Sequence, residues 1–322
     1  MEVSIADSAT LLNKANNIIL TAHVHPDGDA LGSLFALYSF LSAQGKQVRI
    51  LLDDEVPRAF YFLHGWEKVE KPEGIVHTAD LLVVLDASDL ERIGKVSEVI
   101  KAPILNLDHH ISNIKFADYW YIDSQAAATG EIIFKLFKEV NANITPSMAE
   151  ALFTAIATDC GFFRYANTSA QTLKIAAELV ELGAQPHVIS ERLETKPRTV
   201  IEMLPKVLET LEIIDCGDAG NIATIVLNYD AITKLKDDTE GFINYPRNID
   251  GVEIAIMFKE ADDNSVRVSL RSKTVDVSKL ALSFGGGGHA RAAGCTVAEP
   301  LDRAKTLVVE AARKQLAAGF IA

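Results

Sequence analysis

The sequence predicts an α/β protein in which a mainly parallel sheet is flanked by helices. In the first half of the 322-residue chain, short apolar runs alternate with segments of helical pattern. Apolar runs of about five residues are typical of parallel strands that are buried on both faces. Histidines and aspartates directly follow three of these runs. Because ligands bind beyond the carboxyl ends of such strands, we expect a functional site at that edge of the sheet.

The elements of the first domain follow from this alternation. Gly183 is typical of a helix stop, because glycine readily adopts the left-handed conformation that ends many helices. We expect strands at 18–21, 48–52, 81–85 and 104–107, and helices at 30–44, 130–140, 147–158 and 169–182.

A second domain is predicted after residue 211. Residues 186–211 are helical in pattern and mixed in charge, and we interpret them as a linker. The remainder is a smaller α/β domain, so the active site is expected in the cleft between the two domains. In this remainder we expect strands at 222–227, 252–258 and 266–270, and helices at 276–284 and 301–317.

The loop after the first strand is rich in metal-binding side chains. It runs His23-Val24-His25-Pro26-Asp27-Gly28-Asp29. Carboxylates held close together repel one another, and a divalent cation removes that repulsion. Carboxylate oxygens with an imidazole nitrogen suit Mn, Fe or Mg better than a soft metal. The alternative is a polar strand-to-helix loop with an aspartate cap, which needs only one acid.

Three further acidic segments accompany this loop. Asp86 follows the apolar run 81–85, and Asp108-His109-His110 follows the run 103–107. Asp159 follows a long apolar stretch of helical pattern. A lone acid after a helix is usually solvated, so Asp159 by itself is weak evidence for a site.

Together these segments resemble the DHH phosphoesterase superfamily, which is named after its Asp-His-His tripeptide. The four motifs of that family match His23-x-x-x-Asp27-x-Asp29, Asp86, Asp108-His109-His110 and Asp159, in this order. The glycine run 285–288 with His289, followed by Ala290-Arg291-Ala292-Ala293-Gly294, resembles the DHHA1 domain signature. The resemblance implies a DHH catalytic domain at 1–185, a helical linker at 186–211 and a DHHA1 substrate-binding domain at 212–322.

The resemblance also implies roles for individual residues. One ion would be held by His23, Asp27 and Asp86, and a second by Asp29, Asp86, His109 and Asp159, with Asp86 as the bridge. His110 would donate a hydrogen bond or a proton to the phosphate, and Asp108 would orient a histidine ring. Substrate contacts would come from Arg271, Gly286, Gly287, Gly288 and His289, with Arg247 as a weaker candidate.

The activity that the resemblance implies is two-metal phosphohydrolysis, with two divalent ions as cofactors. Mn is expected, and Mg, Fe and Co stay open. The domain pair without additions is similar to enzymes that degrade short oligoribonucleotides to 5'-mononucleotides and dephosphorylate adenosine 3',5'-bisphosphate (pAp) to AMP. A cyclic di-AMP or pApA phosphodiesterase is the alternative. A third alternative is a non-catalytic nucleotide sensor. Such a sensor would usually have lost one or more metal ligands, and no ligand position is lost in this sequence.

Charge and composition limit the partners. The formal net charge of −13 opposes binding of long nucleic acids, which depends mainly on basic surfaces. We therefore expect short single-stranded RNA or a small nucleotide, and no duplex DNA. No apolar run approaches a membrane span, the N-terminus has no secretory pattern, and the three scattered cysteines suit a reducing cytoplasm. The oligomeric state is open, with a homodimer as one alternative.

Overall fold

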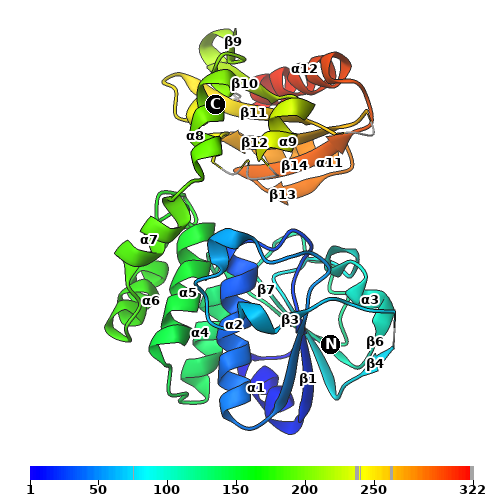
Figure 1. The fold of residues 1–322 in the computed structure, drawn as a ribbon, viewed down its shortest axis with the longest axis vertical. Helices are drawn as coiled ribbons and strands as arrows, with labels where there is room; N and C mark the ends of the chain where they lie inside the picture. Colours follow the sequence, from blue (N-terminus) through cyan, green and yellow to red (C-terminus); the bar gives the residue numbers. More distant parts are fainter. Residues whose placement is uncertain (75, 236–238, 240, 262–263, 320–322) are drawn as a thin grey trace. The chain divides into compact units, whose positions relative to one another are not determined.

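The computed structural model describes residues 1–74, 76–235, 239, 241–261 and 264–319. The chain divides into two compact units, Met1–Thr195 and Lys196–Ala322. Each unit has its own six-stranded sheet and its own hydrophobic core (Figure 1). Among the described helices, we find no apolar segment long enough to span a bilayer.

The sheet of the first unit is parallel throughout. Its strand order is β3-β2-β1-β5-β7-β8, so the chain winds outward in one direction from β1 and in the other from β5. Open parallel sheets bind ligands where the winding reverses, which here is beyond the ends of β1 and β5. The strands are β1 (Asn17–Thr21), β2 (Gln47–Leu51), β3 (Val69–Glu70), β5 (Leu81–Leu85), β7 (Ile104–Asp108) and β8 (Tyr119–Ile122), and a separate parallel pair is formed by β4 (His77–Thr78) and β6 (Ile100–Lys101).

Helices cover both faces of this sheet. On one face α2, α4 and α5 lie side by side, and α1 packs on α4 (Figure 1). On the other face, Ile93 and Val96 pack with Ile19 and Val84 in a smaller hydrophobic core. The helices are α1 (Ile5–Lys14), α2 (Gly28–Ala43), α3 (Val96–Val99), α4 (Thr129–Glu139), α5 (Pro146–Asp159), α6 (Ala170–Glu181) and α7 (Pro186–Glu194), with 3-10 turns at Arg58–Phe60, Trp66–Lys68 and Glu91–Ile93.

The second unit is a mixed sheet with helices on both faces. Its order is β13-β14-β12-β11-β10-β9, in which only the β10–β11 pair is parallel. Helices α11 and α12 pack over one core cluster, and α8, α9 and α10 pack over the other. The elements are α8 (Arg198–Leu208), β9 (Glu212–Asp215), a 3-10 turn (Gly217–Ala219), β10 (Asn221–Leu227), α9 (Tyr229–Leu235), α10 (Asn244–Arg247), β11 (Val252–Glu260), β12 (Val266–Ser272), α11 (Val277–Leu282), β13 (Gly287–His289), β14 (Ala292–Val297) and α12 (Leu301–Gly319).

The predicted fold class is confirmed. Every strand and helix expected by residue range is present, with ends within two residues of those expected. Gly183 follows α6 at φ +110°, as a helix stop requires. The sequence did not predict helices α1, α3, α9 and α10 or strands β3, β4, β6, β8, β9, β13 and β14.

The segment expected to be a linker contains two helices. The compact units divide after Thr195, so α7 belongs to the first unit and α8 to the second. Val200, Met203 and Val207 of α8 are buried in a core cluster of the second unit. The functional domain limits 1–185, 186–211 and 212–322 stay predictions.

A close contact between α2 and α5 positions the polar loop at the start of α2. A Cβ on Gly32 would lie 2.3 Å from the carbonyl oxygen of Ala151, so only glycine allows the two helices to approach this closely. Over-packing of this kind typically costs about 1–3 kcal/mol. We therefore expect Gly32→Ala to lower the free energy of unfolding of the metal-free protein by about that amount in urea denaturation.

Gly74→Ala is the matched control. A Cβ at Gly74 would meet no atom within 4 Å, so the change should alter stability by less than about 0.5 kcal/mol. Equal stability of the two variants would contradict the packing argument.

Candidate metal centre

The loop after β1 aims His23 at the carboxyl edge of the sheet. The His23 Nδ1 lies 2.8 Å from the carbonyl oxygen of Val24. An N–H donated to that carbonyl leaves Nε2 as the acceptor nitrogen. The Nε2 atom lies 3.7 Å from Asp27 Oδ1 and 3.5 Å from Asp86 Oδ2, which is close enough for one cation to contact all three side chains.

Asp27 and Asp29 have different partners. Asp27 is the N-cap of α2, where its Oδ1 accepts from the backbone N–H groups of Asp29 at 3.0 Å and Ala30 at 3.1 Å. The simple capping interpretation of this loop therefore explains Asp27 but leaves Asp29 unexplained. The Asp29 side chain is 1% exposed and points instead to the first turn of α4.

The start of α4 holds Asp29 through backbone groups. The N–H of Thr129 donates to Asp29 Oδ2 at 2.6 Å, and the N–H of Gly130 donates to Asp29 Oδ1 at 2.9 Å. Ser33 adds a hydroxyl donor to Oδ1 at 3.2 Å. The N-cap of α4 is Ala128, which has no capping side chain, so Asp29 satisfies N–H groups that the helix itself leaves unpaired.

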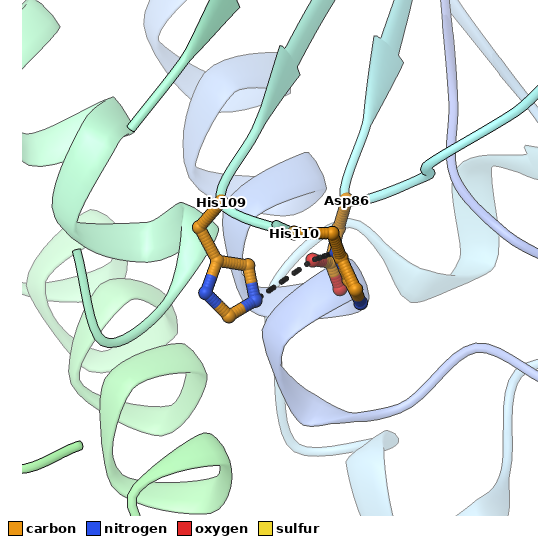
Figure 2. A group of neighbouring side chains, drawn as sticks. All are labelled: Asp86, His109 and His110. Atoms are coloured by element: carbon orange, nitrogen blue, oxygen red, sulfur yellow. Dashed lines mark ion pairs between the residues drawn. The ribbon is translucent and has the colours of Figure 1, made fainter. Parts of the chain in front are cut away.

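Asp86 lies within reach of both His109 and His110 (Figure 2). It follows β5 directly and has a left-handed backbone with φ 55°, a conformation found disproportionately at functional sites. Its Oδ2 faces His23, whereas its Oδ1 lies 3.5 Å from both His109 Nε2 and His110 Nδ1. The two oxygens of one carboxylate thus face two different sets of side chains.

His109 joins the second set. Its Nε2 lies 3.7 Å from Asp29 Oδ2 and 3.7 Å from Asp159 Oδ2, and its Nδ1 lies 3.3 Å from the carbonyl oxygen of Ala126. Asp159 is the last residue of α5, so the acid that was weak evidence by itself lies within the cluster. The structure therefore brings all six sequence-predicted metal ligands together. They form two groups that share no residue, His23 with Asp27 and Asp86, and Asp29 with His109 and Asp159. A third group, Asp86 with His109 and His110, overlaps both.

Asp108 orients His110. The Asp108 side chain is fully buried, and its Oδ1 lies 2.7 Å from His110 Nδ1. Asn113 donates to Asp108 Oδ2 at 2.6 Å and to Asn106 Oδ1 at 2.8 Å. This network fixes the carboxylate, and through it the imidazole ring that is predicted to face the phosphate.

The cluster is electrostatically costly without a cation. Burial, followed by the charges of Asp86 and Asp159, raises the pKa of Asp29 well above its usual range. Burial, with Asp27 and Asp86, raises the pKa of Asp159 to about 7, although His109 opposes the rise. Burial would also raise the pKa of Asp86, but its contact with His23 and the nearby charges of His110 and His109 hold it below its usual value.

The surroundings of His110 favour its protonated, positively charged form. Burial would lower its pKa, but the hydrogen bond to Asp108 and the charge of Asp86 raise the pKa to about 9. An imidazole with this pKa carries a proton near neutral pH, so His110 can act as a donor to an anionic group.

The donor set fits divalent cations. Four carboxylates and two imidazoles provide the oxygen and nitrogen ligands that Mn, Fe or Mg accept. Five of these six side chains are between 1% and 19% exposed, whereas that of Asp27 is 58% exposed. The cluster is thus enclosed by protein on most sides and open to solvent at Asp27.

The predicted substrate residues lie in the second unit. Arg271 on β12 and His289 on β13 share one register partner, Ala292 of β14, so their backbones form one row across three strands. The Arg271 Nη1 donates to the carbonyl oxygen of Leu270 at 3.0 Å. The side chain of His289 lies outside the residues that the structure describes.

The glycine run and Arg247 belong to the same unit. A Cβ at Gly286 would lie 2.1 Å from the carbonyl oxygen of Gly294, and Gly288 has φ +134°, so both positions require glycine, whereas Gly287 has open space. Arg247 ends α10, which packs against β10, β11 and β12.

Two residues next to the metal centre were not found by the sequence analysis. Thr129 contacts both Asp29 and Asp86, and Asn113 contacts Asp108. Thr129 lies at a helix start and Asn113 lies three residues after the Asp-His-His tripeptide. These positions are the only sequence signal that could have identified them.

Comparison with known proteins identifies both units. Residues 17–156 match the family model described as "DHH family, N-terminal domain". Residues 223–318 match the model described as "DHHA1 domain".

Several relatives match this chain along almost its whole length. The chain is 33% identical, over 94% of its length and 92% of the relative's, to a Thermus thermophilus protein named bifunctional oligoribonuclease and PAP phosphatase NrnA. A Bacillus subtilis protein with the same name is 26% identical over 88% of this chain and 90% of its own. A crystal structure of an exopolyphosphatase-related protein from Bacteroides fragilis has a TM-score of 0.88 and 26% identity, covering 98% of this chain and 97% of the other.

Two aspartates of the cluster should affect the stability of the metal-free protein in opposite directions. A carboxyl whose pKa is raised in the folded state destabilises that state once it ionises. For Asp159 this penalty is absent below about pH 4 and complete above about pH 7, given its pKa of about 7. Asp159→Asn should therefore stabilise the metal-free protein at about pH 8 by on the order of 1 kcal/mol, with no gain at about pH 4.

Asp86→Asn is the matched substitution with the opposite sign. The pKa of Asp86 is lowered in the folded state, so its charge stabilises the metal-free protein at neutral pH. Thermal unfolding at several pH values should show destabilisation by on the order of 1–3 kcal/mol. The same sign of change for both variants would contradict the electrostatic description of the cluster.

Proposed function

Because this chain belongs to the DHH family of phosphoesterases, we propose that it degrades short oligoribonucleotides to 5'-mononucleotides and dephosphorylates pAp to AMP. The relatives that carry this pair of activities in their names match almost the whole chain, including both domains. Both activities are hydrolysis of a phosphate ester, so one site with one chemistry serves both.

A single observation carries the catalytic part of the proposal. The two oxygens of Asp86 face separate groups of ligands, one with His23 and Asp27 and one around His109. A carboxylate in this position suits a bridge between two cations. When bound, two cations activate a water molecule and neutralise charge on the phosphate. Mn is the cation we propose first, because the ligands are oxygen and imidazole nitrogen.

The residues of the chain supply the remaining parts of the reaction. Protonated His110 donates to a phosphate oxygen of the substrate and so stabilises the negative charge that develops there. Asp108 keeps the His110 ring in place through its 2.7 Å contact with Nδ1, which leaves Nε2 for the substrate. His23, Asp27, Asp29, Asp86, His109 and Asp159 act as metal ligands.

The second domain contributes substrate binding in this proposal. A guanidinium forms two parallel hydrogen bonds with a phosphate, and backbone N–H groups of a glycine run approach an anion without Cβ obstruction. We assign these roles to Arg271 and to Gly286, Gly287 and Gly288, with His289 and Arg247 as further contacts. From the sequence we also expect no binding of duplex DNA and a cytoplasmic location, while the oligomeric state stays open with a homodimer as one alternative.

A substrate panel tests the function. With Mn²⁺, we expect rapid hydrolysis of pAp and of RNA of two to about five nucleotides. A 24-nucleotide RNA should react much more slowly, because the net charge of −13 opposes further phosphate contacts. If cyclic di-AMP or pApA is cleaved faster than pAp and short RNA, the protein is instead a cyclic di-AMP or pApA phosphodiesterase. Tight nucleotide binding without any hydrolysis would instead identify a sensor.

Substitution of Arg271 tests the role of the second domain. Loss of a charged bidentate contact should lower kcat/KM on pAp by roughly ten- to a hundredfold. Bis-p-nitrophenyl phosphate needs only the metal centre, so Arg271→Ala should change its hydrolysis much less. Arg267 is exposed four residues earlier on the same strand, so Arg267→Ala is a matched control that should leave pAp hydrolysis near the wild-type rate. Equal losses on both substrates would refute the assignment of Arg271.

A further inference from the structure

One residue contacts two of the carboxylates in the metal centre. The backbone N–H of Thr129 donates to Asp29 Oδ2 at 2.6 Å, and its hydroxyl donates to Asp86 Oδ1 at 3.0 Å. Thr129 and Asp86 are 0% and 2% exposed, so water does not compete for these bonds. The sequence separations are 100 residues to Asp29 and 43 to Asp86, and Thr129 therefore joins the segments after β1 and β5 at the start of α4.

The two contacts fix different degrees of freedom. Asp29 is held by two consecutive N–H groups, one on each carboxylate oxygen, so its plane is set by the direction of the helix. Asp86 accepts the Thr129 hydroxyl on Oδ1, the oxygen that faces His109, which leaves Oδ2 toward His23. Rotation of the Asp86 carboxylate would break the bond to Thr129 and would misdirect both oxygens.

We propose that Thr129 is a positioning residue, which sets the orientation of Asp86 relative to Asp29 and thereby the arrangement of the two ligand groups. This inference rests on the proposed function, because it assumes that these groups bind cations. Partners of metal ligands that do not touch the metal typically change metal affinity or activity about 10- to 100-fold when they are removed.

Valine is the informative substitution at this position. Thr129→Val keeps the branched shape and the backbone N–H to Asp29 but removes the hydroxyl donor to Asp86. Thr129→Ser keeps the hydroxyl and loses only a methyl group. The matched control is Thr154→Val, since Thr154 is also 0% exposed but donates to the carbonyl oxygen of Glu150 in its own helix.

Calorimetric titration of metal-stripped protein with Mn²⁺ is the primary measurement. We expect Thr129→Val to weaken the affinity for Mn²⁺ or lower kcat on pAp by about 10- to 100-fold, with KM within about threefold of wild type. Thr129→Ser should stay within about threefold of wild type in both quantities. Thermal midpoints of the metal-free proteins show how much of any change is general destabilisation.

Each other outcome is decisive. Wild-type affinity and kcat in Thr129→Val, or an equal loss in Thr154→Val, would overturn the proposal. If Thr129→Val does not fold, Thr129→Ala is compared with Thr129→Ser, since this pair also differs in the hydroxyl, and equal affinity and kcat would overturn it. If wild-type protein binds Mn²⁺ but hydrolyses neither pAp nor short RNA, the substrate assignment fails while the calorimetric comparison still decides the role of Thr129. Absence of cation binding by wild-type protein would overturn both.

Discussion

The repulsion among four aspartates at one edge of a sheet is the constraint on which the rest of the first unit depends. Burial and the neighbouring carboxylates raise the pKa of Asp29 and of Asp159, whereas contacts with histidines outweigh these effects at Asp27 and Asp86. The fold holds them together through backbone N–H groups at the starts of α2 and α4, which donate to Asp27 and Asp29, and through the imidazoles of His23 and His109, which face Asp86. Bound divalent cations would remove the remaining repulsion, so cation binding is coupled to the local stability of the cluster.

The parallel sheet provides the rigidity that this arrangement needs. β1 and β5 are neighbours at the position where the winding reverses, and their ends direct His23 and Asp86 to the same place. The glycine contact between α2 and α5 brings Asp29 near the start of α2 close to Asp159 at the end of α5. The six predicted ligands are thereby brought together from four short segments, each at the end of a regular element.

The sequence predicts the ligands better than it predicts the residues that hold them. His23, Asp86 and His109 follow or end apolar strands, and this pattern alone places them at one edge. Thr129 was missed because a threonine at a helix start is common, and its importance depends on contacts with residues 100 and 43 positions away. The strand β14 was missed because it begins Ala292-Ala293-Gly294, residues that are poor strand formers and are paired here by tertiary contacts.

We propose that the Asp86 carboxylate bridges two cations held by the two ligand groups. An anomalous-difference map of crystals soaked in Mn²⁺, collected at the manganese edge, tests it most directly. We expect two peaks roughly 3.5–4 Å apart, one on each side of the Asp86 carboxylate. A single peak, or two peaks that do not share Asp86 as a ligand, would contradict it.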